Sequence, residues 1–254
     1  MAVVGNSHVL TLFEGYPLIA RELPGVELTF IARGQHKIGH AVVSRAGVEW
    51  PRPGGDLIDR VGRLDATHVF VMWRGSQANI RGLLQQGPAF DVAVPHEPDR
   101  TIEPDVELIP CSVVEAIIRG TLDADDELLA LIGRAQRGGA MVWLMGPPPA
   151  LPEEAVRERL GEESHFAGRL HQVGVSAGDV EIVPESVRVR LRTILLGVYR
   201  DFAAQHGAGF VPPPAWVADA GGLLERQYWG KDITHASPAY GAVYLRELVE
   251  VAGA

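Results

Sequence analysis

Ser7, near the start of the 254-residue chain, has the residue type and the surroundings that a nucleophile needs. It stands in Gly5-Asn6-Ser7-His8, directly after the apolar stretch Ala2 to Val4 and before a segment of helical period. A serine on such a turn is surrounded by free backbone N–H groups and by the positive end of a helix dipole. The same position is also typical of a serine that merely caps a helix.

A serine nucleophile needs a base, and the base needs an acceptor that orients it. Asp232-Ile233-Thr234-His235, near the other end of the chain, contains both residue types. A separation of three residues within one turn lets the carboxylate of Asp232 reach the imidazole of His235 and fix its tautomer. In the alternative interpretation Asp232 only closes a turn and His235 only precedes the final helix.

Two more loops follow apolar, strand-like runs. In Trp73-Arg74-Gly75-Ser76-Gln77-Ala78-Asn79, the glycine permits close approach of the backbone to a developing oxyanion, and an amide side chain can donate to it. The alternative is a helix start that Ser76 caps. Trp143-Leu144-Met145-Gly146-Pro147-Pro148-Pro149 ends in a rigid proline loop, which we expect to shape the wall of a site.

Short apolar runs that end in polar or glycine loops alternate with longer segments of helical period. The alternation predicts βαβ units and a parallel sheet, with the loops at its carboxyl edge, where ligand sites form. Residues 34 to 66 fit this alternation poorly, and Ile38 to Trp50 is interpreted as an extra strand pair. The expected parallel strands are Val3–Val4, Val26–Ala32, His68–Trp73, Ala140–Met145 and Gly209–Val211.

The segment from Ser186 to His206 has the clearest helical period. Its apolar residues fall on one stripe, and its arginines fall elsewhere, which favours a solvated face over an anion site. The arginines concerned are Arg188, Arg190, Arg192 and Arg200.

The whole chain has a formal net charge of −9 and 46% hydrophobic residues, which is typical of an acidic α/β domain. We expect one domain over residues 1–254. No basic stripe is present, so we expect no nucleic-acid partner, and no apolar run is long enough for a membrane partner. The single cysteine, Cys111, and the absence of a signal segment predict a cytoplasmic protein. The sequence contains no metal-ligand cluster, and we expect no cofactor.

The order of these motifs resembles the SGNH/GDSL hydrolases. That family has a glycine–Xaa–serine after the first strand, a loop with glycine and asparagine after a middle strand, and Asp-x-x-His before the last helix. The similarity extends from Gly5 to Gly241. It implies a three-layer α/β/α sandwich with about five parallel strands in a flavodoxin-like arrangement. It also implies Ser7 as nucleophile, His235 as base and Asp232 as its orienting partner.

In that family the oxyanion hole combines the N–H of the serine, a glycine N–H and an asparagine side chain. The resemblance assigns these roles here to Gly34, Gly75 and Asn79, with Gly47 as the alternative to Gly34. Ser76 and Gln77 are the alternatives to Asn79. The family's aspartate before the nucleophile is replaced by Asn6, which keeps the shape and an acceptor but loses a charge.

The resemblance implies hydrolysis of a small-molecule carboxylic ester, with small acyl groups on sugars or other polar alcohols as candidate substrates. Two other classes remain open. An acyltransferase would use the same three residues with an alcohol acceptor in place of water. A ligand-binding protein of the same fold would be catalytically impaired, as the altered oxyanion motif and Asn6 would allow.

Overall fold

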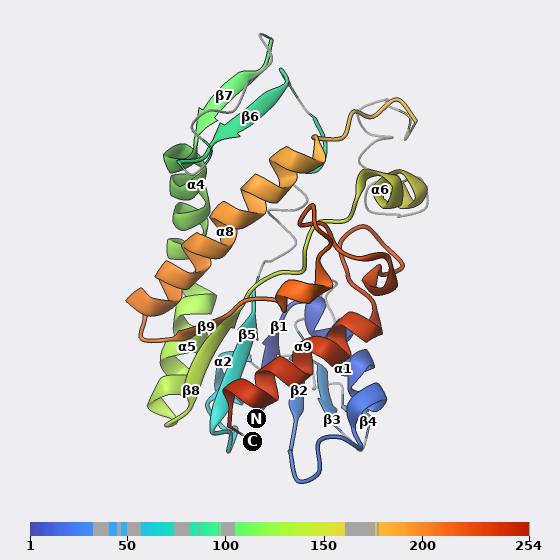
Figure 1. Ribbon diagram of the computed structural model, residues 1–254. Helices are drawn as coiled ribbons and strands as arrows, with labels where there is room; N and C mark the ends of the chain where they lie inside the picture. The colour runs from blue at the N-terminus through green and yellow to red at the C-terminus, as the bar shows by residue number, and fades with distance from the viewer. Residues whose placement is uncertain are drawn as a thin grey trace.

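The computed structural model describes residues 1–32, 57–73, 82–85, 87–95, 97, 105–160, 176 and 178–253, and the backbone of 41–44 and 47–49. Figure 1 shows helices on both sides of a twisted sheet. In chain order the elements are β1 (Ala2–Gly5), α1 (His8–Ile19), β2 (Thr29–Ala32), β3 (Ala41–Ser44), β4 (Gly47–Glu49), α2 (Leu57–Val61), β5 (His68–Met72), β6 (Phe90–Ala93), β7 (Glu107–Pro110), α4 (Cys111–Asp123), α5 (Asp126–Arg137), β8 (Met141–Met145), α6 (Glu153–Leu160), α8 (Glu185–Gln205), β9 (Gly209–Val211), the 3-10 turns η1 (Ala215–Val217) and η2 (Arg226–Tyr228), and α9 (Pro238–Val251).

The main sheet has the order β4-β3-β2-β1-β5-β8-β9 in the described part of the chain. The five strands from β2 to β9 in this order are parallel, as predicted. Numbered along the chain, they follow the flavodoxin-like order 2-1-3-4-5, whose ligand sites form where the order reverses, beside the first strand. Ser7 follows that first strand, and its placement at this switch point follows directly from the topology.

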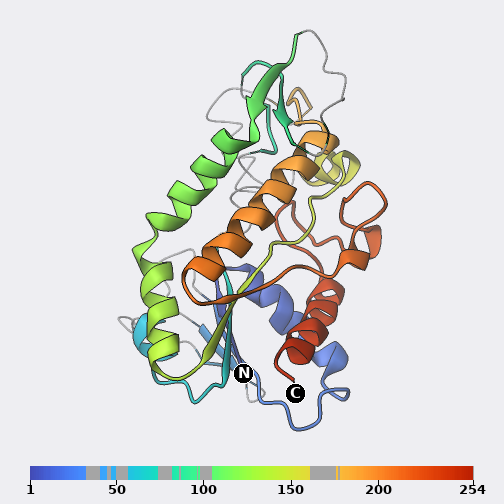
Figure 2. The ribbon, with the colours of Figure 1, turned by 60° about the vertical axis from the view of Figure 1, so that its left-hand side comes forward.

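Two strand pairs lie outside the parallel set. β3 and β4 form an antiparallel hairpin that extends the sheet beyond β2, which confirms the extra strand pair expected between Ile38 and Trp50. β6 and β7 form a separate parallel ribbon, which the sequence analysis did not predict. Figures 1 and 2 both place this ribbon at the top of the view, away from the main sheet and at the ends of α4 and α8.

Alternate residues of each strand face opposite sides of the sheet, and both faces of the sheet are buried under helices. Val3 packs into a core with α1 and α9, whereas its neighbours Ala2 and Val4 pack into a second core with α2, α5 and α8. The result is the expected three-layer α/β/α sandwich. Within the described residues, no helix combines the length and apolar character needed to cross a membrane.

The layer formed by α1 and α9 depends on two glycines. A Cβ on Gly241 of α9 would collide with the backbone carbonyl of Thr11, and one on Gly15 of α1 would collide with the backbone of α9. The two helices therefore approach each other backbone to backbone (Figure 1). α1 follows Ser7 directly and α9 follows His235 within three residues, so this close approach brings the two ends of the chain together.

The arginine face expected on the long helix α8 is only partly correct. Arg200 is exposed, but Arg190 is bound to Asp91 and Glu97 and ties α8 to the β6 region. Arg188 is 5% exposed and donates to the backbone carbonyls of Val183 and Leu151. The prediction was wrong here because helical period separates apolar from charged residues but does not reveal that loops cover the charged side.

Gly241→Ala is expected to lower the melting temperature by roughly 5–10 °C, because the new Cβ overpacks a backbone contact that cannot move aside. Gly120→Ala in α4 is the matched control, since a Cβ there meets no atom within 4 Å. Both changes give a helix the same gain in propensity, so Gly120→Ala should instead be slightly stabilising. Thermal unfolding by circular dichroism measures both, and equal shifts for the two variants would contradict the close-packing account.

Candidate active site

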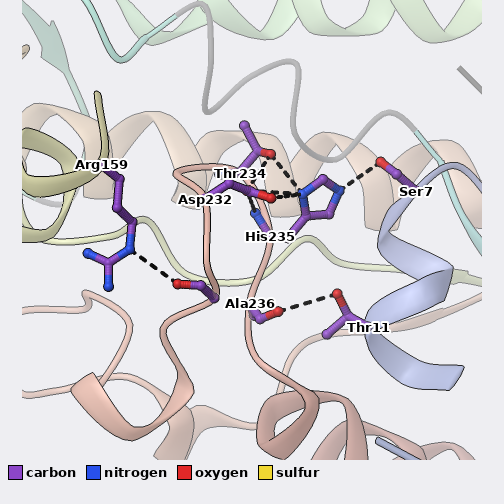
Figure 3. A network of polar contacts seen from close by, with 8 residues as sticks. Ser7, Thr11, Arg159, Asp232, Thr234, His235 and Ala236 are labelled. Carbon is purple, nitrogen blue, oxygen red and sulfur yellow. Dashed lines mark hydrogen bonds and ion pairs between the residues drawn. The ribbon is translucent and has the colours of Figure 1, made fainter. Parts of the chain in front are cut away.

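Ser7, His235 and Asp232 come together at the carboxyl edge of the sheet, although 228 positions separate Ser7 from His235. The Nε2 atom of His235 lies 2.7 Å from Oγ of Ser7. Nδ1 of the same ring lies 2.8 Å from Oδ2 of Asp232 and 3.0 Å from Oδ1. Figure 3 shows the three side chains in line, with the imidazole between the hydroxyl and the carboxylate. These distances satisfy the geometry of a nucleophile, a base and an orienting acceptor.

The end of β1 and the start of α1 position Ser7. A Cβ on Gly5 would collide with the carbonyl of Met72, so the glycine lets the end of β1 lie close against β5. The chain then turns into α1, where Ser7 takes the N-cap position but makes no side-chain capping bond. The structure therefore contradicts the alternative in which the hydroxyl caps the helix. Its place at the helix start leaves the backbone N–H groups of the first turn near the hydroxyl.

Asp232 is held in its orientation by several donors at once. Its Oδ1 accepts from the backbone N–H of Thr234 at 2.8 Å, from that of His235 at 2.7 Å and from the Thr234 hydroxyl at 2.9 Å. Burial by itself would raise the pKa of Asp232, but the hydrogen bonds and the charge of His235, with the backbone donors, hold the pKa well below its usual range. The carboxylate therefore stays ionised and fixes a proton on Nδ1 of His235 in the neutral ring.

The loop that carries Asp232 and His235 is fastened from both sides (Figure 3). Arg159 of α6 donates to the carbonyl of Gly230 at 3.2 Å, and its guanidinium lies over the ring of Trp229. The hydroxyl of Thr11 in α1 donates to the carbonyl of Ala236 at 3.4 Å. These contacts restrict the loop on the side of α6 and on the side of the serine, which preorganises the imidazole.

His8 packs against the imidazole of His235, with the ring centroids 4.6 Å apart. Its side chain is buried, and burial together with the nearby His235 lowers the pKa of His8 to about 3, against a smaller opposing effect of Asp232. His8 is therefore neutral near pH 7 and adds no charge beside the imidazole of His235. The sequence alone gives His8 no role, because nothing in Gly5-Asn6-Ser7-His8 indicates the ring contact.

A cavity of about 30 Å³ adjoins the site on the side of α8. His235 and Thr234 border it, together with Pro148, Pro149 and the two arginines Arg188 and Arg192 of α8. The proline loop thus forms part of the wall beside the histidine, as the sequence analysis expected.

The residues expected at the oxyanion are placed only in part. Gly34, Gly75 and Asn79, and the alternatives Ser76 and Gln77, lie outside the described residues, so their assignment remains a prediction. Gly47 is described, and it begins the edge strand β4, which β3 and β2 separate from β1. This position is remote from Ser7 and leaves Gly34 as the better candidate. In the part of the chain that is described, no group of three or more His, Cys, Asp and Glu side chains is arranged to hold a metal ion.

Comparisons with known proteins bear on the fold. No family model matches the chain, and no curated protein is significantly similar to it. The crystal structure of a DUF4886 family protein from Bacteroides uniformis ATCC 8492 is similar with a TM-score of 0.51 and 9% identity, over 98% of this chain and 82% of the other. This similarity supports the three-layer fold and nothing finer.

Two further solved structures are less similar. A GDSL-like lipase from Bacteroides thetaiotaomicron VPI-5482 has a TM-score of 0.44 and 12% identity, over 99% of this chain and 87% of the other. An extracellular lipase from Streptomyces rimosus has a TM-score of 0.46 and 14% identity, over 98% and 97%. At these scores neither contributes to the argument for function, which depends on the geometry of the site.

His8→Phe should reduce the pH dependence of stability. In the wild type the unfolded chain takes up a proton at His8 below about pH 6.5, whereas the folded protein does so only near pH 3, so stability falls as the pH decreases between these values. One such group contributes a slope of up to about 1.4 kcal/mol per pH unit. Urea unfolding at pH 7, 6, 5 and 4 measures the difference between the two proteins. Equal slopes would show that folding does not lower the pKa of His8.

Proposed function

We propose that the protein is a serine hydrolase of the SGNH/GDSL type that cleaves carboxylic esters through Ser7, His235 and Asp232. The single observation that carries this proposal is the continuous hydrogen-bonded path from Oγ of Ser7 through both nitrogens of His235 to Asp232. Its position at the switch point of a flavodoxin-like sheet, beside a cavity, supports the same conclusion.

The reaction follows from the atoms present. Oγ of Ser7 attacks the ester carbonyl while Nε2 of His235 takes its proton, and the imidazolium is stabilised by the ionised Asp232. The C–O bond to the alcohol then breaks, and the same nitrogen returns the proton to the leaving oxygen. In the second half a water loses its proton to His235 and attacks the acyl-serine, which releases the acid and restores the Ser7 hydroxyl. Small acyl groups on polar alcohols are the proposed substrates.

Two observations favour hydrolysis over a merely ligand-binding role. The Ser7 hydroxyl is committed to His235 instead of to a helix cap. The neutral, buried His8 under the imidazole and the several donors to Asp232 arrange the charges as a base requires. An acyltransferase would use the same geometry with an alcohol in the place of the water, and product analysis with and without added alcohols distinguishes the two.

Ser7→Ala should reduce kcat/KM for small aryl acetates by at least about a thousandfold, because the attacking oxygen is removed. The melting temperature should change little, since the hydroxyl caps no helix. Ser112→Ala, on the exposed side of α4, is the control and should keep full activity. Rates followed by release of the phenol test this directly. Full activity in Ser7→Ala would refute the proposed nucleophile, and a large loss of stability would indicate a structural serine.

The oxyanion is proposed to be held by backbone N–H groups, including that of Ser7, and by the side chain of Asn79. Asn79→Ala should lower kcat by roughly a hundredfold while changing KM little, because the donor acts mainly on charge that develops in the transition state. Ser76→Ala and Gln77→Ala are the matched controls on the same loop and should be nearly silent. Should either control be the damaging change instead, the donor is assigned to the wrong residue.

A further inference from the structure

Arg192 of α8 lines the cavity beside His235 without a counter-charge in the described part of the chain. Its Nε atom is enclosed and has no hydrogen-bond partner there. Burial lowers the pKa of Arg192, against smaller opposing effects of the neighbouring Tyr240 and Tyr244. A guanidinium nevertheless remains protonated in proteins, so the cavity wall carries a fixed positive charge.

The neighbouring groups do not neutralise this charge. Burial raises the pKa of Tyr240 and that of Tyr244, so both phenols are neutral near pH 7. The other charged group on the wall is Arg188, which is 5% exposed and whose Nη2 also has no hydrogen-bond partner. Glu185 lies 3.9 Å from that nitrogen and offsets part of the charge of Arg188 alone. The described wall thus contains two arginines and no carboxylate.

Buried charges in proteins are paired, because an isolated charge loses its hydration without compensation. A partly buried guanidinium that lines the same cavity as His235 is therefore suited to a ligand that supplies the missing anion. A carboxylate matches the planar fork of arginine in shape and charge. Most of the other described wall residues, including Leu151 and Leu191, are apolar and suit a short aliphatic spacer.

We propose that this cavity recognises a carboxylate on the substrate, so that the enzyme prefers acyl esters of short hydroxy acids, with Arg192 as the main anion-binding residue. This inference rests on the proposed ester hydrolysis at Ser7. His235 borders the cavity, and its Nε2 is the atom that protonates the leaving oxygen. We assign the leaving alcohol to this side of His235, so that the carboxylate belongs to that alcohol.

The kinetic test compares 3-acetoxypropanoate with its neutral isostere 3-acetoxypropanamide, by measuring acetate release. The ratio of kcat/KM for the acid to that for the amide should fall by about 10–100-fold in Arg192→Met, the loss expected for a charge-assisted hydrogen bond. Arg192→Lys keeps the charge and should restore part of the ratio. Arg200→Met removes an exposed arginine from the same helix and is the control. A ratio that changes less than twofold in Arg192→Met would overturn the proposal.

A second pair of substrates tests whether the recognised carboxylate belongs to the leaving alcohol. In this pair the carboxylate is on the acyl group instead. Monoethyl succinate carries one negative charge, and its neutral counterpart ethyl succinamate carries an amide in the same place. A preference confined to this second pair would overturn the assignment of the carboxylate to the leaving group.

A binding experiment separates the anion site from the chemistry. The Ser7→Ala variant holds 3-acetoxypropanoate without cleaving it, so 10 mM of this ester should raise its melting temperature, whereas the amide should not. The shift should disappear in the Ser7→Ala, Arg192→Met double variant. If the wild type hydrolyses no ester but this pattern is seen, the anion site stands and the proposed function fails. If esters are hydrolysed but the acid and the amide shift the melting temperature alike, the anion site fails alone.

The ligand-free protein provides a further criterion. Removing a partly buried cation that has no counter-charge among the described residues should not destabilise the fold, so Arg192→Met should melt at the same or a higher temperature than the wild type. A lower melting temperature, with no change in the acid-to-amide ratio, would identify Arg192 as a structural residue and overturn the proposal.

Discussion

The close contact between α1 and α9 is the constraint on which the site depends. Ser7 and His235 lie at opposite ends of the chain. Ser7 directly precedes α1, and His235 lies three residues before the start of α9. Because Gly15 and Gly241 let the two backbones touch, the helix starts lie together and the side chains before them meet at 2.7 Å. Ordinary side chains between two packed helices keep the helix axes about 8–10 Å apart. At that separation the helices would position the hydrogen bond between Ser7 and His235 less tightly.

Around this contact Asp232 and His8 keep fixed protonation states near neutral pH, as the proposed proton transfer from Ser7 to His235 requires. Asp232 stays ionised because the donors of its own turn and of His235 outweigh the effect of burial on its pKa. His8 stays neutral because burial and the nearby His235 lower its pKa by more than Asp232 raises it. Arg192 lines the cavity beside His235, and its positive charge is the one that we propose a ligand carboxylate matches.

Much of this arrangement could be predicted from sequence because the signals are local. The apolar runs that end in polar or glycine loops form the parallel strands, and these loops lie at one edge of the sheet. Ser7 could be predicted from its place after the first strand, and Asp232 and His235 from their spacing before the last helix. The contacts that cross the fold left no such signal. The ring contact of His8, the close approach at Gly241 and the place of Arg188 and Arg192 at the cavity depend on the packing of segments that are far apart in the chain. Helical period marks a charged face, and only the tertiary structure shows whether water reaches it.

The central claim is that Ser7 is an activated nucleophile, and labelling with a fluorophosphonate probe tests it without knowledge of the substrate. The intact protein is treated with the probe and digested, and the modified peptide is identified by mass spectrometry. The account predicts a single adduct on Ser7 that is absent from Ser7→Ala and forms much more slowly in His235→Asn. An unmodified Ser7, or an adduct on another serine that persists in Ser7→Ala, would contradict it.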